Sequence, residues 1–195
     1  SLRDLREQGV EPEALLSLMA RLGSSQPVDL RLSLDEIADG FDLSQFGSAP
    51  TKFDAADLFP LSARKLHALD HAAVADDLRA IGVPGALAPL FWDTVRENVT
   101  TRHDIAPWWR LFSEGVAPDI APEDADFIEQ AFALLPDPPY DANTWSDWTA
   151  RVKDATGRKG KALFMPLRKA VTGQPRGPEM ADVMRLMQVK PGPRA

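Results

Sequence analysis

The sequence of 195 residues predicts an all-α protein, and three observations support this prediction. Almost every apolar stretch repeats at the i, i+3, i+4, i+7 spacing of one helix face. No convincing run alternates apolar and polar residues with the period of two that a half-buried strand requires. No Asn-Gly pair occurs, and the one Asp-Gly pair, Asp39-Gly40, is not flanked by the alternating runs of a hairpin. The length is sufficient for one domain, or for two or three small ones with buried cores.

The first half of the chain contains five expected helices. They cover residues 12–22, a short segment after Ser33, and residues 58–71, 74–81 and 87–95. Pro12 suits a first turn and Gly23 suits a helix end, while Ser33 with Glu36 forms a capping-box pattern. Segment 41–54 is broken by Gly47 and Pro50, so we expect a loop with apolar anchors there.

The second half continues with an amphipathic helix over 127–135, preceded by acidic residues that suit a helix dipole, and with a helix over 145–152. Residues 151–195 are rich in Lys and Arg and form the basic segment. Within it we expect an apolar anchor at Leu163-Phe164, one short helix from Pro166 to Gly173, and a last helix that begins at Pro178. Residues after Lys190 are expected to be disordered.

Composition excludes several classes of protein. No apolar run approaches the roughly 18 residues of a membrane helix. There is no cysteine, which excludes disulfides, thiol nucleophiles and cysteine-ligated zinc and fits a reducing compartment. The charged segment 1–10 does not resemble a signal peptide. We therefore expect a cytoplasmic protein and, because the sequence begins at Ser1 rather than Met, a piece of a longer chain.

Charge is distributed unevenly along the chain. Residues 151–195 carry eleven Lys and Arg against three Asp and Glu, a net charge of +8, so the first 150 residues carry −15. Such asymmetry indicates a polyanionic partner at one end of the molecule. The alternative is a basic solvated face without a partner.

Catalytic patterns are missing. His67 and His71 have a spacing that can grip a metal, but no third ligand is near in sequence. Gly157-Arg-Lys-Gly-Lys161 fails as a phosphate loop because Ala155 and Ala162 replace its required residues. No nucleophile-elbow, dinucleotide or zinc-protease motif occurs. We expect no catalytic residue, metal or cofactor in this chain.

The residues that indicate a function lie in the basic segment. Arg158, Lys159 and Lys161 surround a glycine-flanked turn before two expected helix starts, an arrangement suited to phosphates and base edges. Arg168, near an expected helix start, could donate paired hydrogen bonds to a base. Three apolar side chains, those of Met165, Pro178 and Met180, could offer flat surface to unpaired bases. The alternative is a basic helix pair that packs on its own domain.

These residues also carry a family resemblance. The pattern Gly157-Arg-Lys-Gly-Lys-Ala-Leu-Phe-Met-Pro-Leu-Arg168, followed by Thr172-Gly and Gly177-Pro-Glu-Met180, resembles the C-terminal signature of bacterial glutamyl-tRNA synthetases. Residues 1–23 resemble the segment after the KMSKS-type loop of that family, and Phe41-Asp-Leu with Ala49-Pro-Thr-Lys-Phe-Asp54 resembles its linking motif. The resemblance covers essentially the whole chain in order.

The resemblance implies successive small helical bundles of the class I aminoacyl-tRNA synthetase anticodon-binding type. It divides the chain into a stem-contact segment (1–60) and two anticodon-binding subdomains (61–135 and 136–195). The family's catalytic domain, which binds ATP with Mg²⁺ and glutamate, would precede Ser1. The implied partner is tRNA-Glu through its anticodon loop and stem, with no DNA or membrane partner.

Residue roles follow the matching positions. The resemblance implies that Arg168 contacts an anticodon base, with Met165 beside it, and that bases pack against the helix start at Gly177, Pro178, Met180 and Ala181. Arg158, Lys159 and Lys161 are assigned to phosphates from charge alone. The position that distinguishes Glu from Gln anticodons cannot be located by motif.

Two other hypotheses remain at this point. The chain could be a non-catalytic truncated paralogue that serves as an RNA- or protein-interaction module. It could also be an unrelated helical enzyme whose site is spread beyond motif detection, although every catalytic pattern fails.

Overall fold

A computed structural model describes residues 1–48 and 50–192. Within these ranges the regular elements are α-helices and 3-10 turns, and the only strand-type pairing is an isolated bridge between Ser24 and Phe46. This confirms the all-α prediction. The chain forms two compact units, unit 1 (Ser1–Leu78 with Arg96–Ile105) and unit 2 (Arg79–Val95 with Ala106–Ala195). The chain therefore passes between the units three times.

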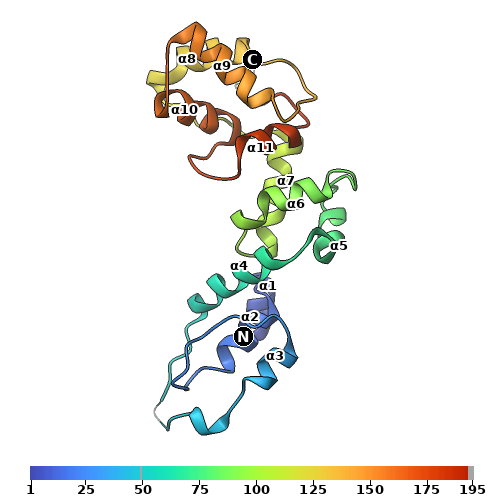
Figure 1. Ribbon diagram of the computed structural model, residues 1–195, viewed down its shortest axis with the longest axis vertical. Helices are drawn as coiled ribbons and strands as arrows, with labels where there is room; N and C mark the ends of the chain where they lie inside the picture. The colour runs from blue at the N-terminus through green and yellow to red at the C-terminus, as the bar shows by residue number, and fades with distance from the viewer. Residues whose placement is uncertain (49, 193–195) are drawn as a thin grey trace. The chain divides into compact units, whose positions relative to one another are not determined.

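Unit 1 is built from short helices. They are α1 (Leu2–Glu7), α2 (Pro12–Met19), α3 (Leu34–Asp39), α4 (Leu58–Ala68) and the beginning of α5 (Ala75–Ala80), with 3-10 turns η1 (Leu43–Gln45), η2 (Ala55–Asp57), η3 (His71–Val74), η4 (Arg96–Asn98) and η5 (Arg102–Asp104). As the sequence predicts, Pro12 lies in the first turn of α2 and Ser33 caps α3. α2 packs against α4, and Ala14, Leu18 and Leu58 are buried in their shared core (Figure 1).

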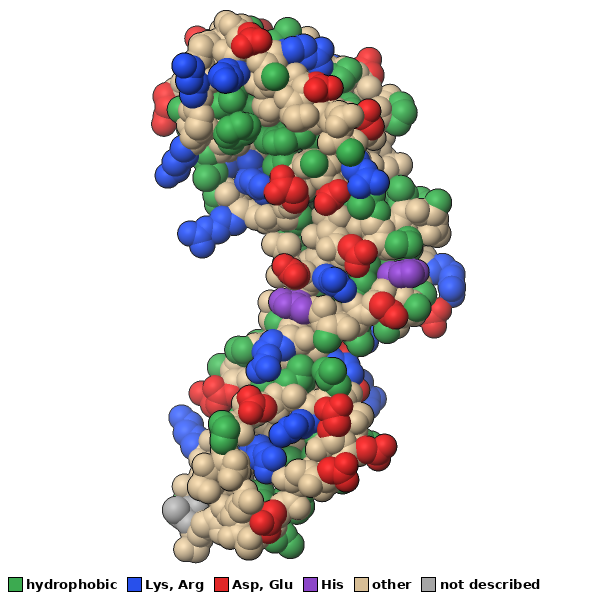
Figure 2. Space-filling model, in the orientation of Figure 1, with side chains coloured by type: hydrophobic (Ala, Val, Ile, Leu, Met, Phe, Trp, Pro, Cys, Tyr) green, Lys and Arg blue, Asp and Glu red, His purple; other side chains and the backbone are tan. Residues whose placement is uncertain are grey.

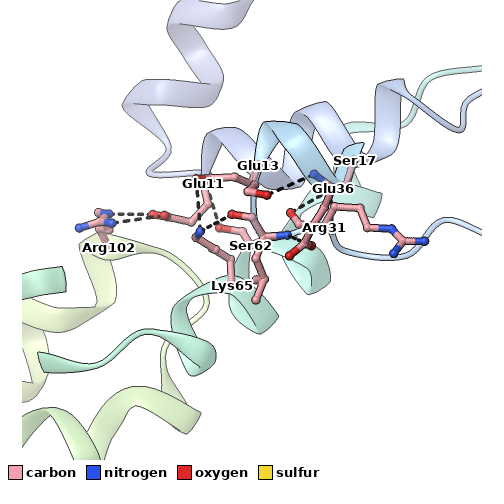
Figure 3. Close-up of polar contacts among 10 residues, drawn as sticks. Glu11, Glu13, Ser17, Arg31, Glu36, Ser62, Lys65 and Arg102 are labelled. Carbon is pink, nitrogen blue, oxygen red and sulfur yellow. Dashed lines mark hydrogen bonds and ion pairs between the residues drawn. The ribbon is translucent and has the colours of Figure 1, made fainter. Parts of the chain in front are cut away.

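A buried glutamate joins the two chain segments of unit 1 (Figure 3). The Glu11 carboxylate is 5% exposed and accepts hydrogen bonds from the Arg102 guanidinium at 2.7 and 3.3 Å. The Glu11 backbone N–H donates to Ser62 Oγ at 3.0 Å, and Arg102 also pairs with Asp77. The hydrogen bond with Glu11 is the main reason that the pKa of Arg102 is raised. Because Arg102 belongs to the returning segment 96–105, this cluster fastens that segment to the rest of unit 1.

Unit 2 contains longer helices around an aromatic core. They are α6 (Ala88–Val95), α7 (Ile105–Glu114), which begins at the unit boundary, α8 (Ala125–Ala133), α9 (Thr144–Thr156), α10 (Lys161–Thr172) and α11 (Met180–Leu186), with a 3-10 turn η6 (Pro122–Asp124). α11 packs on α6 and α9, and α8 packs on α9 and α10 (Figure 1). Phe91 makes edge-to-face contacts with Trp109 and Phe112, at centroid distances of 5.5 and 5.9 Å.

Two helices, α1 and α7, are absent from the sequence prediction. α7 had a clear signal, because Ile105, Trp108, Trp109 and Phe112 follow the i, i+3, i+4, i+7 spacing and all four are buried. Pro107 lies within this pattern, but it belongs to the first turn of α7, where the backbone N–H groups have no partners within the helix.

The end of the chain also differs from the expectation. Pro191 and Gly192 are buried in unit 2, so the prediction of a disordered tail is wrong for these two residues. Gly192 has φ +106°, and a Cβ atom there would lie 2.3 Å from the Phe132 ring. The rest of the predicted tail, residues 193–195 with the basic Arg194, lies outside the described residues.

The sequence-based division at residues 60/61 and 135/136 does not coincide with the boundaries of the two compact units, which follow residues 78, 95 and 105, and it stays a prediction. Among the described residues, no helix combines the length and the apolar character needed to cross a membrane.

Candidate nucleic-acid interface

The basic segment forms a turn, a helix and a loop within unit 2. α10 begins at Lys161, five residues before the expected start at Pro166, which lies inside the helix. Proline has no N–H to donate to the carbonyl of Ala162, four residues earlier. The Nη1 group of Arg158 donates to this carbonyl at 3.3 Å instead. An arginine side chain thus replaces the missing backbone hydrogen bond, and this helps the helix to extend past its proline.

Arg158 makes three contacts inside unit 2. Besides the Ala162 carbonyl, its guanidinium pairs with Asp124 at 2.5 Å and lies over the Phe127 ring, 4.0 Å from the centroid. These contacts join α10 to the beginning of α8. The assignment of Arg158 to RNA phosphates stays a prediction, and its surroundings favour a role in holding unit 2 together.

The other predicted phosphate contacts are placed differently. Lys159 and Lys161 are exposed, and neither has an ion-pair partner within residues 1–48 and 50–192. Lys and Arg side chains project from unit 2 on the side where Figure 1 places α10 and the loop before α11 (Figure 2). Four basic residues of segment 151–195 do pair with carboxylates: Arg158 with Asp124, Lys169 with Asp119, Arg185 with Asp182 and Lys190 with Asp137. The net charge of +8 therefore overstates what this segment offers to a polyanion.

Arg168 lies in the second half of α10, not near the helix start as expected. Its Nη1 donates to the Pro178 carbonyl at 3.0 Å, which ties the helix to the loop before α11. Gly177 in this loop has φ +147°, and a Cβ atom there would lie 3.3 Å from Trp108 and 3.8 Å from Arg168. Trp108 is thus a neighbour of the predicted site that the sequence reasoning missed together with α7.

The predicted apolar surface is largely absent. Met165 is partly exposed, but Pro178 is buried and Met180 is only 2% exposed, so the expectation that these two offer flat surface to bases is wrong. The physical reason is that α11 begins at Met180, with Glu179 as its N-cap, and packs Met180, Val183 and Met184 into the core. Ala181 is partly buried.

Comparison with known proteins decides the family. Residues 55–189 match the family described as "Anticodon binding domain". The chain belongs to this family.

Named relatives of this anticodon-binding chain are similar over nearly its whole length. It is 66% identical over 191 residues to "Glutamate--tRNA ligase 2" of Dinoroseobacter shibae and 64% identical to the protein of the same name from Jannaschia sp.. These matches cover 98% of the chain but only 43% and 42% of the relatives, so the chain spans less than half their length.

Solved structures show the same fold. A glutamate-tRNA synthetase from Elizabethkingia anophelis superposes with a TM-score of 0.71 at 23% identity, over 94% of this chain and 39% of that one. A glutamate tRNA ligase from Elizabethkingia meningosepticum gives a TM-score of 0.70 at 24% identity, over 93% of this chain and 39% of that one. These likenesses confirm the helical fold class of the anticodon-binding domain.

Among the described residues, no group of three or more His, Asp or Glu side chains is placed to hold a metal ion. α4 ends at Ala68, so His67 and His71 do not share a helix, and His67 Nε2 lies 2.9 Å from the Val99 carbonyl.

The hydroxyl group of Tyr140 in unit 2 has a shifted pKa. Burial raises this pKa to about 12, with a smaller contribution from Asp137, and the hydroxyl donates a hydrogen bond to the Pro136 carbonyl.

Proposed function

We propose that this chain is the anticodon-binding part of a glutamate–tRNA ligase, which attaches glutamate to tRNA-Glu using ATP. The carrying observation is the match of residues 55–189 to the anticodon-binding family, in a chain 66% identical to a protein named as such a ligase. Under this proposal ATP, Mg²⁺ and the catalytic residues belong to a catalytic domain in the remaining length of the protein. Residues 1–60 contact the tRNA stem, and the partner is tRNA rather than DNA.

The proposed contacts divide into positioning and reading. Lys159 and Lys161, exposed and without ion-pair partners in the described chain, contact phosphates without sequence preference. Arg168 reads a base: one N–H is held by the Pro178 carbonyl, which fixes the plane of the guanidinium, and its other N–H groups are available to a base edge. Gly177 is exposed and has no side chain, so a base can approach the loop backbone there.

The test is a titration of the chain with tRNA-Glu and with the same tRNA carrying a swapped anticodon, at two salt concentrations. We expect a preference for the native anticodon that persists at the higher salt, because base contacts do not depend on counterion release. Equal and strongly salt-dependent binding of both tRNAs would leave only a basic patch and would overturn the anticodon assignment.

The alternative is a non-catalytic paralogue that serves as an interaction module. No feature of the described residues favours it over anticodon binding. In the same titration it predicts no binding of either tRNA.

A further inference from the structure

Phe164 is the exposed aromatic residue of α10. The sequence grouped it with Leu163 as an apolar anchor, but only Leu163 is buried, at 2% exposure, while Phe164 is 45% exposed. Among the described residues of unit 2, no other large apolar side chain is exposed to this degree. A single exposed phenylalanine is common on protein surfaces and does not by itself indicate a function. The residues that surround Phe164 do indicate one.

The Phe164 ring has a fixed support behind it. It stands at the end of a row of aromatic rings: Trp145 lies 6.4 Å from it at a tilt of 38°, Trp148 lies 5.6 Å from Trp145, and Phe132 lies 5.1 Å from Trp148. Trp148 is fully buried, and its indole N–H donates to the Ala131 carbonyl at 2.8 Å. A ring held in this way loses little conformational freedom when a flat ligand stacks on it.

The charges around Phe164 complement nucleic acid. Lys161 lies three residues before Phe164 and Arg168 lies four residues after it, so the three side chains share one face of α10, where Lys161 is exposed and Arg168 is partly buried. The sequence from Ala155 to Pro178 contains no Asp or Glu. A π surface between cations, without a carboxylate in the surrounding segment, suits a base that carries its own phosphate. An apolar protein segment would match Phe164 but would leave Lys161 desolvated beside it.

We propose that Phe164 is a stacking platform for an unpaired RNA base next to the base that Arg168 reads. Residues four apart on a helix have Cβ atoms about 5–6 Å apart, so neighbouring nucleotides of one loop can reach both side chains. This inference rests on the proposed function, because it takes the RNA loop to be the ligand of α10.

The experiment uses the full chain and a hairpin RNA of the tRNA-Glu anticodon arm, with 2-aminopurine placed at one loop position at a time. Stacking on the ring changes the fluorescence at one position. F164L keeps an apolar side chain but removes the π face, so we expect it to abolish that change and to weaken binding about 5- to 100-fold. F164Y and F164W should retain both signals.

Salt dependence and folding controls separate the outcomes. F164L should leave the salt slope of binding unchanged, whereas Lys161→Ala should lower it by about one unit. Thermal unfolding should show that F164L is still folded, because the Phe164 ring is 45% exposed and Leu keeps an apolar side chain beside Trp145. Wild-type binding with F164L indistinguishable from it would overturn the stacking proposal and leave the proposed function intact. Failure of the wild type to bind any tRNA would overturn the proposed function and, with it, the stacking proposal that rests on it. Equal losses in F164L and F164Y would point to packing with another protein segment and also overturn stacking.

Discussion

Arg158 and Lys159 are adjacent in sequence but have different roles in unit 2. We predict that Arg158→Ala lowers the free energy of unfolding by about 2 kcal/mol, because it removes the pair with Asp124, the contact with Phe127 and the hydrogen bond to Ala162. Lys159→Ala should change stability by less than about 0.5 kcal/mol but weaken RNA binding. Denaturant unfolding and tRNA titration of both variants check this, and a stable Arg158→Ala variant with weakened RNA binding would reverse the assignment.

Variants of Arg168 and Lys161 test the proposal that Arg168 contacts a base whereas Lys161 contacts phosphates. Arg168→Ala should weaken tRNA-Glu binding by about 1–3 kcal/mol and reduce the preference for its anticodon, whereas Lys161→Ala should weaken all tRNAs alike. Arg168→Lys is the matched control, since it keeps the charge and loses the planar fork. Equal effects of both alanine variants on native and anticodon-swapped tRNA would contradict the division.

Gly192 has almost no room for a side chain. Gly192→Ala brings a Cβ atom within 2.3 Å of the Phe132 ring at a φ of +106°. We expect a loss of about 1–3 kcal/mol of stability, from overpacking together with backbone strain. Gly85→Ala is the control, because a Cβ atom at Gly85 would meet no other atom within 4 Å and its φ is not in the left-handed region. Thermal unfolding of the two variants measures the difference, and equal melting temperatures would count against the tight contact.

At the scale of elements, the sequence predicts helix existence well where capping or periodicity is local. Ser33 caps α3, Gly173 follows the last residue of α10, and α8, α9 and α11 follow their apolar stripes. The start of α10 could not be predicted in this way. A proline is common in the first turn of a helix, and the contact that compensates for Pro166 inside α10, from the Arg158 side chain to the Ala162 carbonyl, depends on a side-chain conformation that spacing does not reveal.

The junction of α2 with the returning segment gives an element-scale prediction. Arg102→Ala leaves the Glu11 carboxylate, which is 5% exposed, without its cation, and should destabilise unit 1 by about 3 kcal/mol. Lys190→Ala breaks a pair with Asp137, whose side chain is 84% exposed, and should cost less than about 1 kcal/mol. Denaturant unfolding compares the two variants, and hydrogen exchange of the α2 and α4 amides shows whether the loss in Arg102→Ala lies in unit 1. Unchanged protection in Arg102→Ala would show that the cluster does not hold the segment.

For the whole molecule, the sequence marked a candidate RNA-binding segment but did not show which of its side chains are exposed and unpaired. Charge counting marked residues 151–195, yet carboxylates elsewhere in unit 2 pair with Arg158, Lys169 and Lys190. Apolar character likewise could not tell Met180, which faces the core, from Phe164, which faces solvent. Both distinctions depend on contacts between residues far apart in sequence, which periodicity and spacing do not contain.

Exposed apolar side chains are concentrated in unit 1. A hollow of about 490 Å³ there is lined in part by Leu2, Leu15, Met19 and Phe53. Patches of this kind bind apolar dyes or other surfaces. We predict that the chain binds the dye ANS and that the double variant Leu2→Asn/Met19→Gln lowers the fluorescence, whereas Leu43→Asn, which is exposed but does not line the hollow, has a smaller effect. Equal decreases in both variants would show that the hollow is not the dye site.

Because the chain passes between the units three times, the two units complete their folding at different stages of synthesis. Every segment of unit 1 has been synthesised once Ile105 has been added, so unit 1 can finish folding while translation continues. α6, with Phe91 and Trp92 fully buried in the finished unit 2, is made early but packs against α11 near the other end of the chain. The part of α6 that contacts α11 can therefore be covered only after α11 has been synthesised, whereas Phe91 can already pack on Trp109 and Phe112 of α7. Unit 2, which contains the basic segment, can therefore complete its core only after every segment of unit 1 has been made.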